Sequence, residues 1–327
     1  MKKFLRISLI STAAFFGIYI AAALIMVFLP EPTFSVAPFP ATESVDADFT
    51  ELTFTARDGE SLFARQFPAE ADTTILLVHG ATADSAVFNK SAQLLREATG
   101  AEIITLDLRG HGRSGGALGD VDYIGQYEDD LVDVITALQS ENPQKSLILA
   151  GHSMGGGIAL RFAELSEKPT VDGYLLFAPH LGSKSPTMPQ PDPETAEFAA
   201  AYSQLHLPRL IGIAMLNGIG IKLLNAQDTL FFNLPDTVTH TYTYRALVNV
   251  APLDYGTALS AVDAPMLVIV GSNDEAFVAD AFPDAITSHS DGEVHIINGE
   301  THPGIVENQT AMTLVEQWFS KTEFTSR

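Results

Sequence analysis

The feature that most restricts the fold is Ser153, which lies in a glycine-rich stretch between two regular segments. Residues 146–150 are a short apolar run typical of a buried parallel strand, and residues 158–165 have a helical pattern. A chain that turns so abruptly from strand to helix holds the residue at the turn in a strained backbone conformation. A Cβ atom at Gly151 or Gly155 would crowd the neighbouring backbone, so glycine permits the turn. The pattern predicts a serine hydroxyl exposed at the end of a strand.

Strands and helices alternate along most of the chain. Such alternation predicts an α/β fold, in which helices cover both faces of a mostly parallel sheet. The sheet is expected to open with an antiparallel hairpin over residues 49–67, where two alternating segments flank an Asp-Gly turn. Further strands are expected at residues 74–78, 103–106, 174–178, 266–270 and 294–297. Helices are expected at residues 85–98, 123–139 and 304–319.

The alternation stops in residues 179–252, here called the insertion. A proline-rich segment opens it, and apolar segments of helical spacing follow. An insertion late in a parallel sheet is well placed to cover a site as a helical cap. The apolar residues over 205–224 are interpreted as the core of that cap, or alternatively as an acyl-binding surface. The candidate substrate-lining residues are His180, Phe198, Tyr202, Leu210, Met215 and Phe231.

The first 29 residues have a different character. Three basic residues precede residues 7–29, a run without charge that is long enough to cross a bilayer as a helix. The run exceeds the apolar core of a cleavable signal peptide, so we predict an uncleaved transmembrane signal anchor over residues 1–29. Its basic end should stay in the cytoplasm, which places the remainder in the periplasm or outside the cell. Cleavage would instead release a secreted protein. Residues 30–47 contain four prolines and predict an extended linker.

Composition excludes several classes of function. The formal net charge is −22, with 18 basic against 40 acidic residues, so binding to a nucleic-acid backbone is not expected. The chain has no cysteine, which excludes disulfides, thiol catalysis and cysteine metal sites. No histidine pair has the spacing of a helical zinc site, so neither a metal nor another cofactor is predicted.

Two polar residues follow the last two predicted strands. Asp274 comes shortly after residues 266–270, and His302 comes shortly after residues 294–297. Because the carboxyl ends of parallel strands meet at one edge of a sheet, both should lie near Ser153. A serine hydroxyl is a weak nucleophile that needs a base, and the base needs an orienting acid. Ser153, His302 and Asp274 are therefore the candidate catalytic residues. Glu275 is a competing acid with a longer side chain.

Together with further motifs, these residues resemble a known family. The motifs are His79-Gly80, residues 107–114 (DLRGHGRS), residues 151–156 (GHSMGG), Asp274 and His302. The chain resembles the α/β-hydrolases, most of all the branch of monoacylglycerol lipases, lysophospholipases and serine aminopeptidase-like enzymes. The resemblance covers residues 48–178 and 253–327, and it implies an α/β-hydrolase core there with the insertion as a cap or lid.

The resemblance also implies a mechanism that needs no cofactor. His302 would take the proton of Ser153 while an acyl-enzyme forms, and Asp274 would fix the tautomer of the imidazole. The backbone N–H groups of Ala81 and Met154 would form the oxyanion hole.

Several functions remain open at this stage. An apolar insertion and a membrane anchor favour a carboxylic ester or lipid with an aliphatic acyl group. An aminopeptidase-like enzyme would instead need carboxylates for a free amine, and Asp192, Glu194 and Glu197 are the candidates. An acyltransferase would use the same acyl-enzyme. A scaffold without turnover would keep only the fold.

Overall fold

A computed structural model of the chain describes residues 2–41, 44–190, 193–322 and 324. For residues 2–11, 13, 193–196 and 198 it describes the backbone alone.

An eight-stranded sheet forms the centre of the molecule, in the order β1-β2-β4-β3-β5-β6-β10-β11. Its strands are β1 (Thr50–Thr55), β2 (Ser61–Phe67), β3 (Thr73–Val78), β4 (Glu102–Leu106), β5 (Ser146–His152), β6 (Gly173–Phe177), β10 (Met266–Gly271) and β11 (Glu293–Ile297). The strands β1, β2 and β4 pair antiparallel, and all other neighbours in this sheet pair parallel. The predicted hairpin and the predicted parallel sheet are therefore confirmed.

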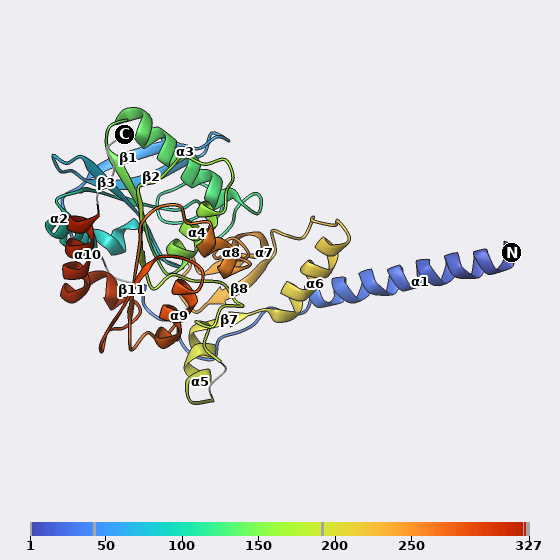
Figure 1. Cartoon of the computed structure of the whole chain (residues 1–327). Helices are drawn as coiled ribbons and strands as arrows, with labels where there is room; N and C mark the ends of the chain where they lie inside the picture. Colours follow the sequence, from blue (N-terminus) through green and yellow to red (C-terminus); the bar gives the residue numbers. More distant parts are fainter. Residues whose placement is uncertain (1, 42–43, 191–192, 323, 325–327) are drawn as a thin grey trace.

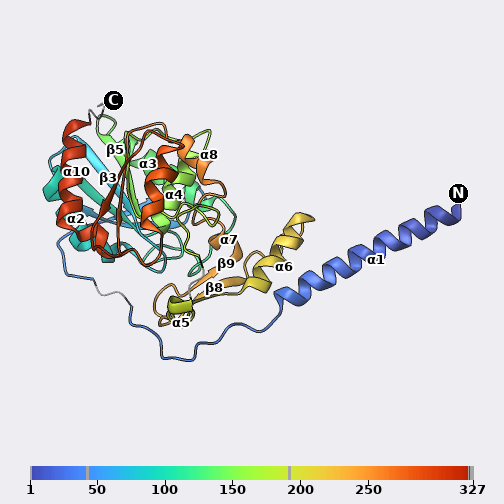
Figure 2. The ribbon, with the colours of Figure 1, turned by 60° about the horizontal axis from the view of Figure 1, so that its bottom comes forward.

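Helices lie on both faces of this sheet (Figure 2). They are α2 (Asn89–Thr99), α3 (Gln126–Glu141), α4 (Met154–Ala163), α8 (Tyr255–Ser260), α9 (Phe282–Thr287) and α10 (Gln309–Lys321), with short 3₁₀ turns η1 (Ser85–Phe88), η2 (Ala279–Ala281) and η3 (Gly304–Glu307). Helices α2 and α10 cover one face, and α3, α4 and α8 cover the other. The central strands have no exposed face, which explains why their sequences are continuous apolar runs.

The insertion contains a second sheet. Its elements are α5 (Pro193–Tyr202), β7 (Ser203–Leu205), α6 (Leu207–Gly218), β8 (Asp228–Phe232), β9 (Thr241–Thr243) and α7 (Tyr244–Leu247). Strands β7, β8 and β9 form an antiparallel sheet in that order. The insertion, predicted as a helical cap, thus contains strands as well as helices. Strands of three to five residues are too short to show a period of two in the sequence.

The N-terminal helix α1 (Lys2–Val27) extends away from the rest of the molecule, and its C-terminal part lies beside α6 (Figure 1). Ala23 and Val27 pack against Ile213 and Leu216 of α6. Arg209 of α6 is buried there. It donates a hydrogen bond to the carbonyl of Val27 and forms an ion pair with Glu31.

The predicted membrane anchor is not confirmed. Across the described residues, we find no helix with the length and apolar character needed to span a bilayer. Most of the first half of the predicted segment lies outside the described side chains.

Candidate active site

The backbone turns sharply at Ser153, directly between β5 and α4. Its φ is 53° and its ψ is −117°, a conformation that non-glycine residues rarely adopt. A Cβ on Gly151 would lie 2.4 Å from the carbonyl carbon of Gly155, and a Cβ on Gly155 would lie 2.2 Å from the carbonyl oxygen of Val78. Gly151 is therefore required where β5 packs against the start of α4, and Gly155 where the turn packs against β3. The strained turn expected from the sequence is present.

Asp274 and His302 meet after the ends of β10 and β11. The imidazole Nδ1 of His302 lies 2.8 Å from Oδ2 of Asp274, whose side chain is fully buried. The other oxygen, Oδ1, accepts the backbone N–H groups of Ala276 and Phe277. A carboxylate only accepts, so Nδ1 carries a proton, and in the neutral ring Nε2 is then the acceptor.

Glu275 has a different role. Its Oε2 accepts the backbone N–H of His302 at 3.0 Å, while the imidazole of the same residue contacts Asp274. The two neighbouring carboxylates thus hold the main chain and the ring of His302 separately, which favours Asp274 as the acid.

His302 is held next to the Ser153 turn by a neighbour, His152. The ring centroids of the two histidines are 4.6 Å apart, and Nε2 of His152 lies 2.9 Å from the carbonyl oxygen of His302. No direct hydrogen bond between Ser153 and His302 is found among the described residues. Such contacts are often long in unliganded sites and tighten when substrate binds.

One candidate oxyanion donor, Met154, follows the serine directly, and the other, Ala81, belongs to the loop after β3. A Cβ on Gly80 would lie 3.3 Å from Cβ of Ser153, so the loop after β3 contacts the serine closely. Met154 is the first residue of α4, where N–H groups have no partner inside the helix. In the described part of the chain, nothing accepts a hydrogen bond from the N–H of Ala81. Both groups are therefore free to bind an anion.

The other histidines at this edge of the sheet are neutral. Burial, with a further contribution from the neighbouring His302, lowers the pKa of His152 to about 3. Burial and His302 likewise lower the pKa of His180 to about 4. His180 packs on Phe277, whose ring is 5.2 Å from that of His302. Phe277 had no signal in the sequence, because nothing marks an aromatic residue near Asp274 as part of the site.

The six predicted lining residues are scattered. Tyr202 lines a cavity of about 110 Å³ together with Thr82 of the oxyanion loop and Pro40 of the linker. Met215 packs instead toward α1, where its carbonyl accepts the hydroxyl of Tyr19. Leu210 is half-buried on α6, Phe231 is buried on β8, and the side chain of Phe198 lies outside the described part.

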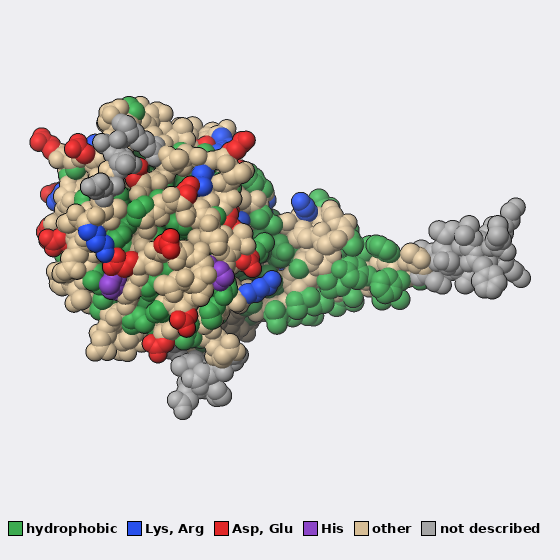
Figure 3. Space-filling model, in the orientation of Figure 1, with side chains coloured by type: hydrophobic (Ala, Val, Ile, Leu, Met, Phe, Trp, Pro, Cys, Tyr) green, Lys and Arg blue, Asp and Glu red, His purple; other side chains and the backbone are tan. Residues whose placement is uncertain are grey.

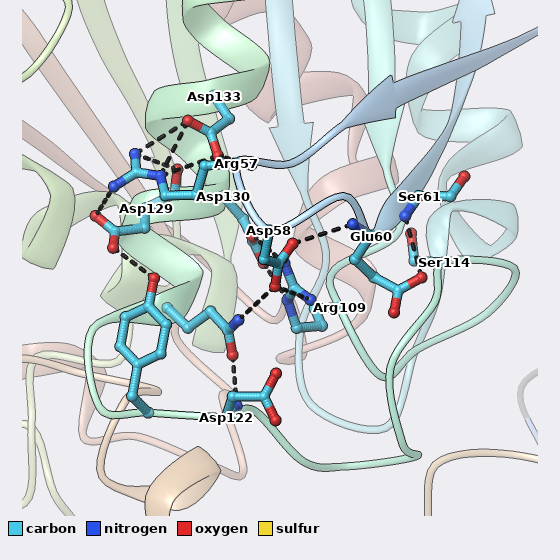
Figure 4. Close-up of polar contacts among 12 residues, drawn as sticks. Arg57, Asp58, Glu60, Ser61, Arg109, Ser114, Asp122, Asp129, Asp130 and Asp133 are labelled. Carbon is cyan, nitrogen blue, oxygen red and sulfur yellow. Dashed lines mark hydrogen bonds and ion pairs between the residues drawn. The ribbon is translucent and has the colours of Figure 1, made fainter.

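The loop of residues 107–114 is held by a buried charge network (Figure 4). Arg109 is 3% exposed and donates to both carboxylate oxygens of Asp130, and it also forms an ion pair with Asp58. Asp107 accepts the backbone N–H groups of Ser85 and Arg113. Arg109 is therefore occupied in holding the loop and has no group left for a substrate.

The described side chains contain no group of three or more His, Asp or Glu residues that could hold a metal ion. Of the three carboxylates considered for an aminopeptidase, Glu197 is exposed, and the side chains of Asp192 and Glu194 lie outside the described part.

Comparison with known proteins shows the family. Residues 69–309 match the family model described as serine aminopeptidase, S33, a family of α/β-hydrolases. The chain belongs to this family. The match includes Ser153, Asp274 and His302 as well as the whole insertion.

Individual members of the family match over shorter stretches. The chain is similar to the monoglyceride lipase of Rattus norvegicus, with 31% identity over 125 residues that make up 37% of this chain and 40% of the relative. It is similar to the monoacylglycerol lipase of Mycolicibacterium smegmatis, with 32% identity over 88 residues that make up 27% of this chain and 31% of the relative. The matched regions thus span less than half of each lipase.

Among solved structures, one described as a membrane phospholipase A, a novel bacterial virulence factor, aligns with 98% of this chain and 99% of its own. The TM-score is 0.56 and the identity 18%, so this likeness shows a shared fold alone. The chain is accordingly an α/β-hydrolase related to lipases.

Proposed function

We propose that this protein is a serine hydrolase that cleaves carboxylic esters with an aliphatic acyl group. The observation that carries the proposal is the contact of 2.8 Å between Nδ1 of His302 and the fully buried carboxylate of Asp274. This contact fixes the tautomer of the neutral imidazole, so that Nε2 is the nitrogen that can act as the general base for Ser153.

The reaction proceeds in two stages. Nε2 of His302 takes the proton of the Ser153 hydroxyl while Oγ bonds to the carbonyl carbon of the ester. The oxyanion accepts the N–H groups of Ala81 and Met154, and the alcohol leaves with the proton held by His302. Water then attacks the acyl-enzyme with His302 as its base, which releases the carboxylic acid and restores Ser153.

An apolar surrounding supports an aliphatic acyl group. Phe277 and His180, which is neutral, lie beside His302. The relatives named as monoglyceride and monoacylglycerol lipases support the same choice.

A series of p-nitrophenyl and glycerol esters with acyl chains of 2 to 16 carbons tests the proposal. We expect kcat/KM to rise with chain length before it levels off, and Ser153→Ala to abolish turnover. A preference for acetate, or a flat profile, would contradict the aliphatic substrate. If the wild-type chain turned over none of these esters, the proposal that it is an esterase would be contradicted.

The family description favours a second candidate, an aminopeptidase-like amide hydrolase with the same triad. Amino-acid amides in the same assay distinguish the two. Turnover of amides in preference to esters, lost on substitution of Glu197 by Gln, would support the aminopeptidase. Transfer of the acyl group from the acyl-enzyme to an added alcohol would instead indicate an acyltransferase.

We further propose that α1 attaches the enzyme to a membrane, with the catalytic part on the extracytoplasmic side. Phe15, Ile18, Ile25 and Phe28 are each more than 60% exposed, and apolar side chains continue along the helix to α6 (Figure 3). Flotation with lipid vesicles tests the attachment. The full chain should float with the vesicles, and a chain that lacks residues 1–29 should stay in the dense fraction.

A further inference from the structure

Tyr242 of β9 joins the insertion to the oxyanion loop. Its side chain is buried, with 1% of the residue exposed, and its hydroxyl contacts two loops of the catalytic core. The backbone N–H of Thr82 donates to this oxygen at 2.8 Å. Nε2 of His111 lies 2.7 Å from it on the other side.

The protons of this network can be assigned from its partners. Nδ1 of His111 lies 2.9 Å from the carbonyl oxygen of Arg109, which only accepts, so Nδ1 carries a proton. Burial lowers the pKa of His111 to about 3, so the ring is neutral and Nε2 is an acceptor. The hydroxyl of Tyr242 therefore donates to His111 and accepts from Thr82. Each donor in the network has one acceptor, and all the bonds run in one direction.

The peptide bond between Ala81 and Thr82 is held at both of its polar atoms. Its N–H donates to Tyr242, and its carbonyl oxygen accepts the hydroxyl of Thr82 at 2.6 Å. Thr82 has a φ of 62°, which is strained for a β-branched residue and persists only where its surroundings impose it. The Ala81 N–H belongs to the preceding peptide bond, so the held Ala81–Thr82 peptide acts on it indirectly, by fixing the backbone on the C-terminal side of Ala81.

We propose that Tyr242 is a positioning residue, which holds the Ala81–Thr82 peptide and so restrains the loop that carries the Ala81 N–H, keeping this donor in place before substrate binds. The inference rests on the proposed function, because it assigns a role within that oxyanion hole. The insertion then contributes to the active site, since Tyr242 of its sheet holds the Thr82 backbone in the core. A donor oriented in advance does not have to reorganise during the reaction, which is the source of its effect.

The test compares Tyr242→Phe with a matched control, Tyr127→Phe. Tyr127 is also fully buried, and its ring lies 6.4 Å from that of His111, but among the described residues its hydroxyl has no hydrogen-bond partner. We expect Tyr242→Phe to lower kcat roughly tenfold with KM changed less than twofold, since loss of a whole donor costs about 10²–10³. Affinity for a trifluoromethyl ketone, which mimics the tetrahedral intermediate, should fall by the same factor. Tyr127→Phe should leave all three values unchanged.

Two further measurements keep the test decisive. Hydrogen exchange at the Thr82 amide should be faster in Tyr242→Phe than in the wild type. If Tyr242→Phe does not fold, His111→Asn replaces it. This substitution removes the Nε2 acceptor of the Tyr242 hydroxyl but keeps a donor for the Arg109 carbonyl. It should lower kcat by a similar factor. Wild-type kcat and wild-type ketone affinity in a folded variant would overturn the positioning role. A wild-type chain without esterase activity would instead contradict the proposed function.

Discussion

At Ser153 the chain adopts a conformation that its neighbours make possible. The φ of 53° directs the side chain away from the end of β5, and the glycines around it allow α4 to approach β3. The strain is local, and the surrounding sheet imposes it. The same packing that stabilises the fold thus exposes the hydroxyl.

Substitution of Gly155 by Ala tests this packing. The added Cβ would lie 2.2 Å from the carbonyl oxygen of Val78, and backbone atoms cannot move aside as a flexible side chain can. We expect a loss of about 1–3 kcal/mol of unfolding free energy in urea, together with loss of activity. Gly218→Ala is the control, because nothing lies within 4 Å of its added Cβ. Equal stability of the two variants would contradict the account.

Asp274→Asn separates the two neighbouring carboxylates. The amide keeps the size of the side chain but favours the wrong tautomer of His302, so we expect kcat to fall by about 10³–10⁴. Glu275→Gln leaves an oxygen for the backbone N–H of His302 and should cost less than tenfold. If both variants lost a comparable part of kcat, the assignment of the acid role to Asp274 alone would be wrong.

At the scale of elements, α1 and the insertion form one packed unit. Arg209 of α6 is buried and donates to the carbonyls of Val27 and Asp228, so it joins the end of α1 to β8. The Arg209 side chain thus donates hydrogen bonds to main-chain carbonyls of both elements. The position of the insertion is therefore coupled to that of the N-terminal helix.

Arg209→Ala should loosen this unit. The variant removes the Arg209 donor from the carbonyl of Val27, which is buried, and from that of Asp228, which is half-buried. A buried group left without a partner costs about 1–3 kcal/mol. We expect limited proteolysis to cut the insertion faster than in the wild type, whereas Lys222→Ala, an exposed residue of the same region, should not change the rate. Equal rates for all three proteins would exclude the coupling.

The sequence predicts the elements of the core much better than those of the insertion. The strands β3, β5 and β10 are buried on both faces, so their apolar runs can be recognised without any tertiary information. Ser153, Asp274 and His302 can be placed because each follows a strand whose end defines its position. Tyr242 has no such marker, since β9 has three residues and its contact with Thr82 spans 160 positions.

At the scale of the whole molecule, buried neutral histidines make stability depend on pH. Burial lowers the pKa of His111 and of His152 to about 3, and it also lowers the pKa of His79. The unfolded chain protonates these rings near pH 6.5 while the folded chain does not. Their contribution is therefore complete above pH 6.5 and is lost as the pH falls toward 3.

We expect the unfolding free energy to decrease from pH 7 to pH 5, as measured by urea titration at each pH. His152→Gln keeps a donor for the His302 carbonyl but cannot be protonated, so the slope should be smaller in this variant. A slope equal to that of the wild type would show that His152 does not contribute.

The central claim is that His302 and Asp274 activate the hydroxyl of Ser153. Intact-mass measurement after incubation with a fluorophosphonate tests it most directly, because this reagent bonds covalently to an activated serine. The account predicts one adduct per chain on the peptide that contains Ser153, none in Ser153→Ala, and much slower labelling in His302→Ala. An unlabelled folded wild-type chain, or an adduct that persists in Ser153→Ala, would contradict it.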